Sequence, residues 1–238
     1  MIDLHSHVLP GMDDGAKKVD MSMAMLKEAK RQGVSLVAAT SHCVTDKESG
    51  IEKFLSKRSK AYEELSAALS SHKDECPKII LGAEVYLGCD LSELPNLSKL
   101  CLGDTNYMLL EFAHGYDARR LAEWVYNISI KGIKPVIAHI DRYGNFVDIM
   151  QELQGVDVVY QVNASRFCSM LGRMTLKKVF NNSDKVLVSS DMHNLTNRAP
   201  NMAAAYEAAG KKFKGLQSML FEDCARCVTE NRPFVFQN

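Results

Sequence analysis

Apolar and polar positions alternate in blocks along the whole chain. Short runs rich in Val, Ile and Leu are typical of buried strands, and the longer stretches between them repeat apolar residues at helical spacing. This pattern predicts seven strands, at residues 1–7, 34–40, 78–86, 107–112, 134–140, 156–163 and 185–190. It predicts helices at residues 21–31, 51–71, 118–131, 146–153, 170–181, 199–212 and 216–231.

The unbroken alternation of strands and helices indicates one α/β domain built on a parallel sheet. There is no linker, low-complexity segment or strong internal repeat beyond this alternation, so we predict a single domain over residues 1–238. The chain has about the length of a (β/α) barrel, which is typically about 250 residues long. The alternation alone allows the sheet to close as a barrel or to stay open.

Strand after strand ends in a side chain that can bind a metal ion. His5 and His7 are two positions apart on the first strand, so their imidazoles point to the same side. The loop that follows carries two carboxylates, Asp13 and Asp14. Because α/β enzymes build their sites at the C-terminal ends of parallel strands, we expect the strand-end side chains to meet. The further candidates are His42, Glu84, Glu111, His139, Asp191 and His193.

A metal centre explains this set better than separate structural roles do. Carboxylates within apolar strands, such as Glu84 and Glu111, are almost never fully buried unless they are paired. Mixed histidine and carboxylate ligands suit manganese, iron or zinc, and the set is large enough for two ions and about large enough for three. The two remaining histidines, His72 and His114, lie in polar surroundings and are expected to be solvated.

Two arginines follow candidate ligands. Arg142 comes shortly after His139, and Arg198 comes shortly after His193. A guanidinium group matches phosphate oxygens in a bidentate manner. Two such groups beside a metal centre predict a substrate that carries phosphate.

Composition narrows the range of partners and compartments. Lys+Arg and Asp+Glu both number 29, and this balance offers no electrostatic case for nucleic acid or an anionic membrane as partner. The chain has no run of about 18 apolar residues, so no transmembrane helix is expected. The seven cysteines are odd in number and irregularly spaced, which predicts reduced thiols in the cytoplasm. The pair Cys224 and Cys227 is expected to be structural, and the oligomeric state is left open.

With these residues laid out, the chain resembles the polymerase and histidinol phosphatase (PHP) superfamily. The opening D-x-H-x-H-x-L-P-G-x-D-D-G, here Asp3 to Gly15, is similar to the bacterial capsule and exopolysaccharide tyrosine phosphatases within it. The resemblance runs from Met1 to about Pro233. It implies a distorted (β/α)7 barrel with three divalent ions, commonly manganese. It also implies a substrate, phosphotyrosine on the cytoplasmic tail of the autokinase that controls polysaccharide chain length and export.

The resemblance further implies how the residues divide their roles. Glu84 would bridge two ions, and Arg142 and Arg198 would hold the phosphate. The implied ligand sets are His5, His7, Glu84 and Asp191 for the first ion, Glu84, Glu111 and His139 for the second, and Asp14, His42 and His193 for the third. Two departures from the family pattern, Cys43 and the segment 140–141, bear on substrate fit rather than on the type of reaction.

Divalent ions lower the pKa of bound water, so the predicted reaction needs no covalent intermediate. A cysteine-dependent phosphatase is rejected, because Ser49 rather than arginine stands six residues after Cys43. A small phosphoester such as histidinol phosphate remains the alternative substrate within the same fold. An amidohydrolase is disfavoured, because the sixth strand ends at Asn163 and Glu84 would have no role. A non-catalytic PHP module is disfavoured, because it would have no reason to keep both arginines.

Overall fold

The computed structural model describes residues 1–234, and residues 235–238 of the predicted domain lie outside the described part. The strands are β1 (Ile2–Ser6), β2 (Leu36–Ala39), β3 (His42–Cys43), β4 (Lys78–Leu81), β5 (Glu84–Tyr86), β6 (Tyr107–Glu111), β7 (Lys134–Ile137), β8 (Val159–Asn163) and β9 (Val186–Ser189). The α-helices are α1 (Val19–Arg31), α2 (Glu48–Leu69), α3 (Ala118–Ile130), α4 (Phe146–Glu152), α5 (Met170–Asn182), α6 (Met202–Lys212) and α7 (Cys224–Thr229). A π-helical segment, Met219–Asp223, leads into α7.

The strands form two parallel sheets, in the orders β1-β2-β4 and β3-β5-β6-β7-β8-β9. β2 pairs with β4 at the same sequence offset at which β3 pairs with β5. The second pair therefore continues the first pair beyond a short break.

Two of the predicted strands are corrected by this break. The strand predicted at 34–40 ends at Ala39, and His42 belongs to a new short strand. The strand predicted at 78–86 is interrupted next to Gly82, where the chain packs tightly. A Cβ atom at Gly82 would lie 2.7 Å from the Leu102 side chain, so only glycine fits there without a shift of its neighbour.

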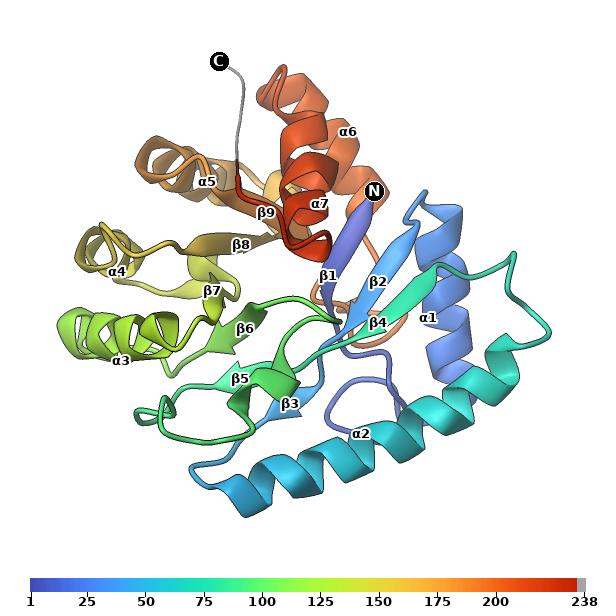
Figure 1. The fold of residues 1–238 in the computed structure, drawn as a ribbon. Helices are drawn as coiled ribbons and strands as arrows, with labels where there is room; N and C mark the ends of the chain where they lie inside the picture. Colours follow the sequence, from blue (N-terminus) through green and yellow to red (C-terminus); the bar gives the residue numbers. More distant parts are fainter. Residues whose placement is uncertain (235–238) are drawn as a thin grey trace.

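The two sheets together surround a common centre, with the helices on the outside (Figure 1). In this view α1 and α2 lie on one side of the strands, and α3, α4 and α5 lie on the other. After β9 the chain returns to β1, and two backbone hydrogen bonds join the segments. The N–H of Asp191 donates to the His5 carbonyl at 3.0 Å, and the N–H of His7 donates to the Met192 carbonyl at 2.9 Å. These few bonds replace a regular ladder between β9 and β1. The fold is an α/β fold of parallel strands, arranged as expected for the distorted barrel that the family resemblance implies.

The barrel interior is apolar at the end where the strands begin. The side chains that fill it include Ile2, Leu4, Leu109, Val136, Val159 and Leu187, together with Cys224, Ala225 and Val228 of α7. Helix α7 thus closes this end, and the polar side chains gather at the opposite end. Cys224 is buried in this core, and all seven cysteines, which lie within residues 1–234, are free. No helix in the described part is both long and apolar enough to cross a membrane.

Candidate metal centre and active site

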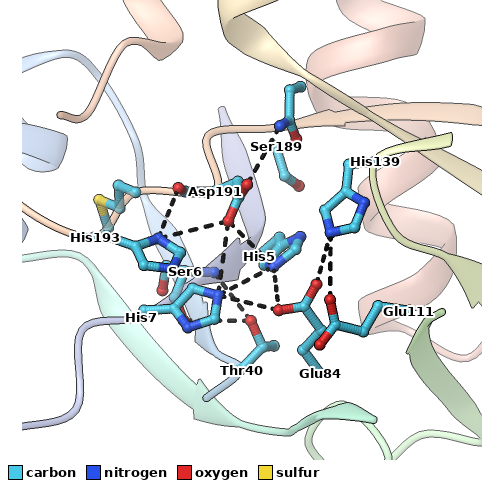
Figure 2. Close-up of polar contacts among 12 residues, drawn as sticks. His5, Ser6, His7, Thr40, Glu84, Glu111, His139, Ser189, Asp191 and His193 are labelled. Carbon is cyan, nitrogen blue, oxygen red and sulfur yellow. Dashed lines mark hydrogen bonds and ion pairs between the residues drawn. The ribbon is translucent and has the colours of Figure 1, made fainter. Parts of the chain in front are cut away.

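A bulge in β1 decides where the two N-terminal histidines point. Between Ile2 and Ser6, β1 contains one residue more than the facing stretch of β2. One extra residue moves all later side chains to the other face of a strand. Ile2 and Leu4 therefore point into the barrel core before the bulge, and His5 and His7 point into the same interior after it (Figure 2).

Glu84 lies at the centre of the site and is buried. Its Oε2 atom is 3.1 Å from His5 Nε2 and 3.2 Å from His7 Nε2. The same oxygen is 3.0 Å from His42 Nδ1. Glu84 Oε1 is 2.9 Å from His139 Nε2 (Figure 2). One carboxylate thus faces four imidazoles from three places in the fold, namely the end of β1, β3 and the turn after β7.

Asp191 approaches the same histidines from the other side. Its Oδ1 atom is 3.4 Å from His5 Nε2 and 3.6 Å from His7 Nε2. The rings of His7 and His193 are stacked at 3.7 Å, and His193 Nε2 is 3.3 Å from Asp14 Oδ1. All nine predicted ligands therefore lie in one continuous cluster, the ninth being Glu111, which is 2.8 Å from His42.

The two predicted arginines lie at the rim of this cluster. Arg142 Nη1 is 3.5 Å and Arg198 Nη2 is 2.7 Å from the same oxygen, Asp191 Oδ2. Their side chains are 39% and 35% exposed, so both guanidinium groups reach solvent. Arg198 Nη1 also lies 3.5 Å from Asp14 Oδ2.

Several buried polar atoms in the cluster have no hydrogen-bond partner within residues 1–234. Buried polar atoms are normally paired, and unpaired ones are costly. Here the unpaired atoms converge on shared points, which is the arrangement of ligands around a cation. They include Glu84 Oε2, Asp191 Oδ1, His42 Nδ1 and His193 Nε2.

The pKa values of His5 and His42 show the same demand for positive charge. Burial alone would lower the pKa of His5, but the charges of Glu84 and Asp191 outweigh it and raise the pKa to about 9. Burial likewise opposes protonation of His42, yet its close contacts with the Glu111 and Glu84 carboxylates raise its pKa to about 11. Protons on these rings offset the carboxylates, and a divalent ion bound by neutral imidazoles would do so with more charge.

Within residues 1–234, three groups of side chains each have their ligand atoms within 4.8 Å of one another. They share members, so the groups adjoin as in a polynuclear site. Their histidine and carboxylate donors suit manganese, iron or zinc. The groups are His5, His7 and Glu84; His42, Glu84 and Glu111; and His7, Asp14, His42 and His193.

A second layer of polar residues contacts the candidate ligands, and of its members only Asp13 stands out in the sequence. Asp13 Oδ2 is 2.9 Å from His7 Nδ1 and also accepts the backbone N–H of His42 at 3.0 Å. Asp3 is buried and accepts hydrogen bonds from the backbone N–H and hydroxyl of Ser190. The signal for Asp13 was present in the opening motif, since two adjacent carboxylates follow the histidines there. Two further members of this layer, Gln161 and Asn163, lie on β8.

Backbone geometry at the site is also unusual. His139 and Asp191 have φ angles of 33° and 54°, in the left-handed region that costs energy for residues other than glycine. Such strain clusters at functional sites and persists where neighbours enforce it. Gly15 brings the Asp13–Asp14 loop against β1, because a Cβ atom there would lie 2.2 Å from the His7 carbonyl oxygen.

The residues expected to be bystanders lie outside the cluster. The side chain of His72 is 40% exposed, and its Nδ1 lies 2.8 Å from Glu75. His114 is exposed, and its ring lies 5.5 Å from that of Tyr143. Cys43 is buried in the apolar core, and burial raises the pKa of its thiol to about 11. A buried, protonated thiol is a poor nucleophile, in agreement with the rejection of a cysteine-dependent mechanism.

The family description "Capsular polysaccharide synthesis, CpsB/CapC" matches residues 1–229. The chain belongs to the CpsB/CapC family. Two curated relatives match nearly all of the chain. The tyrosine-protein phosphatase CpsB of Streptococcus pneumoniae is 35% identical over 246 residues, covering 96% of this chain and 98% of that protein. The tyrosine-protein phosphatase YwqE of Bacillus subtilis (strain 168) is 28% identical, covering 100% of this chain and 94% of that protein.

Solved structures agree with the assignment to the CpsB/CapC family. One comes from the crystal structures of YwqE from Bacillus subtilis and CpsB from Streptococcus pneumoniae, described as unique metal-dependent tyrosine phosphatases. It matches with a TM-score of 0.82 and 26% identity, covering 100% of this chain and 97% of that one. A dihydroorotase from Campylobacter jejuni matches with a TM-score of 0.56 and 11% identity, covering 99% and 84% of the two chains. That second likeness concerns the fold alone.

Proposed function

We propose that this chain, as a single domain, is a metal-dependent tyrosine-protein phosphatase. The observation that carries the proposal is the convergence of nine histidine and carboxylate ligands with two guanidinium groups at one end of the barrel. The activity in the names of the CpsB and YwqE relatives supports the same conclusion.

The proposed cofactors are three divalent ions, with manganese first and iron or zinc as alternatives. The three adjoining ligand groups support this number. His42 belongs to both the second and the third group, because its Nδ1 atom is 2.8 Å from Glu111 and its Nε2 atom is 3.5 Å from Asp14. The ligand sets implied by the resemblance are kept in the proposal, with His42 adjoining the second. Bound divalent ions supply Lewis-acid chemistry, lowering the pKa of water and offsetting phosphate charge.

The protein side chains position the phosphate, and a tyrosyl leaving group needs little further assistance from them. Arg142 and Arg198 donate to non-bridging phosphate oxygens, and their shared contact with Asp191 keeps both guanidinium groups beside the ligands. Tyrosine has a pKa of about 10, so a tyrosyl oxygen leaves with little help from a proton donor. An alkyl phosphate has a far more basic leaving group and would need such a donor.

The proposed substrate is a phosphotyrosine-bearing segment of a tyrosine kinase that acts in capsule synthesis. The family's role in capsular polysaccharide synthesis supports a substrate in that process. The site also opens to solvent, since Asp14 is 62% exposed at its rim. A residue carried on another protein can therefore approach it. The cytoplasmic location stays a prediction from the thiols.

The test compares substrates and metals on the purified protein. We expect a phosphotyrosine peptide to be hydrolysed with a higher kcat/KM than histidinol phosphate or an alkyl phosphate. Chelation should abolish the activity, and Mn²⁺ should restore it. A higher kcat/KM for histidinol phosphate would reject the tyrosine phosphatase proposal, and full activity after complete removal of metal would reject metal dependence.

A further inference from the structure

A chain of buried amide groups runs behind the ligands. Gln161 and Asn163 lie two positions apart on β8, and both are buried. Gln161 Oε1 is 3.0 Å from His5 Nδ1 and 2.6 Å from the backbone nitrogen of His139. Gln161 Nε2 donates to Asn163 Oδ1 at 2.9 Å, and Asn163 Nδ2 donates to Asp191 Oδ2 at 3.2 Å.

One obligatory donor determines the direction of every hydrogen bond in this row of side-chain amides. A backbone N–H can only donate, so the Gln161 atom that faces His139 must be its oxygen. That oxygen also accepts from His5, which places a proton on His5 Nδ1. The Nε2 atom of a neutral His5 ring is then left with its lone pair pointing to Glu84, from which it is 3.1 Å distant.

The same row of amides determines which oxygen of Asp191 accepts hydrogen bonds. The amide nitrogen of Gln161 is left for Asn163, whose own amide nitrogen is left for Asp191 Oδ2. Arg198 donates to that oxygen as well. The other oxygen, Oδ1, has no hydrogen-bond partner in the described part of the chain and faces His5 and His7. The network therefore leaves one lone-pair-bearing atom on each side chain directed at the same point.

We propose that Gln161 is a positioning residue of the metal centre. Together with Asn163 it sets the tautomer of His5, the strained backbone of His139 and the free oxygen of Asp191. Residues hydrogen-bonded to metal ligands tune metal affinity in this manner. The inference rests on the metal binding proposed above and not on the identity of the substrate. An apolar side chain would fill this point of the barrel, so packing alone gives no reason for an amide.

The test replaces each function of Gln161 separately in the full-length protein. Gln161→Met keeps the length of the side chain and removes both its acceptor and its donor. Gln161→Glu keeps an acceptor for His5 and His139 but loses the donor to Asn163. Tyr107→Phe is the matched control, because it removes a buried hydroxyl that donates to the Arg232 carbonyl at 3.2 Å, at the opposite end of the barrel.

Two measurements are made without any substrate. Mn²⁺ affinity is measured by titration of the metal-free proteins, and the His5 tautomer by ¹⁵N NMR of the Zn²⁺-loaded proteins. We expect Gln161→Met to weaken Mn²⁺ binding by about 10- to 100-fold and to lose the single Nδ1–H tautomer. Gln161→Glu should bind Mn²⁺ more tightly than Gln161→Met and keep the tautomer, and Tyr107→Phe should bind like wild type.

Several outcomes would overturn the proposal. Wild-type affinity in Gln161→Met would do so, as would an equal loss in Tyr107→Phe or a Gln161→Glu variant no better than Gln161→Met. Asn163→Leu, which removes the link to Asp191, replaces Gln161→Met if that variant does not fold, with the same expected loss. If the wild-type protein binds no metal, this inference and the proposed function fail together. If it binds metal but does not hydrolyse phosphotyrosine, only the proposed function fails.

Discussion

Replacing Arg142 with alanine separates phosphate binding from metal binding. A guanidinium group is protonated and has no lone pair for a metal, so its removal takes no ligand from the ions. Arg142 is also the less embedded of the two arginines, since its contact with Asp191 is 3.5 Å long while that of Arg198 is 2.7 Å. Its loss should therefore disturb the position of Asp191 very little.

The size of the effect follows from the exposure of the side chain. A hydrogen bond to a charged group contributes about 1.5–3 kcal/mol, which corresponds to roughly 10- to 150-fold in rate. Arg142 is 39% exposed, so water can replace part of the lost contact. We expect the lower half of the range, about a 10- to 50-fold loss of kcat/KM. Arg198→Ala should lose at least as much, because Arg198 also contacts Asp14.

The assay measures kcat/KM on a phosphotyrosine peptide and bound manganese on the same preparations. Arg226→Ala serves as the control, because Arg226 lies on α7, where it pairs with Glu222 away from the site. It should keep both activity and metal. The phosphate-binding role would be refuted if Arg142→Ala lost its metal, or if it kept the full kcat/KM.

Three further predictions test the ligands, the loop and the thiol. Glu84→Gln should lose more than one ion, because Glu84 Oε2 lies within about 3 Å of three imidazoles; metal analysis beside Glu222→Gln checks this, and full metal content would contradict it. Gly15→Ala should lower both Tm and metal affinity, because its Cβ would meet the His7 carbonyl oxygen at 2.2 Å; an unchanged Tm in thermal unfolding would show that the loop relaxes freely. Cys43→Ser should keep most of its activity and metal, because Cys43 is 2% exposed in the core; a variant with intact metal and no activity would argue for a thiol mechanism.

The alternation of strands and helices and the set of candidate metal ligands could be predicted from the sequence. Both depend on local properties, namely the hydrophobic period and the chemical type of the residue at each strand end. A general rule then connects them, because the C-terminal ends of parallel strands meet at one end of a barrel. For this reason His5, Glu84 and Asp191, far apart in the chain, could be assigned to one site.

The exact directions of those side chains were decided by tertiary structure. The bulge in β1 exists only in the pairing with β2, and the break at Gly82 reflects its close approach to Leu102. Gln161 gave no signal in its apolar strand, because its partner His5 is 156 residues away. Hydrogen bonds between such distant strands leave no period in the sequence. They are selected by the packed geometry, which sets where each donor and acceptor lies.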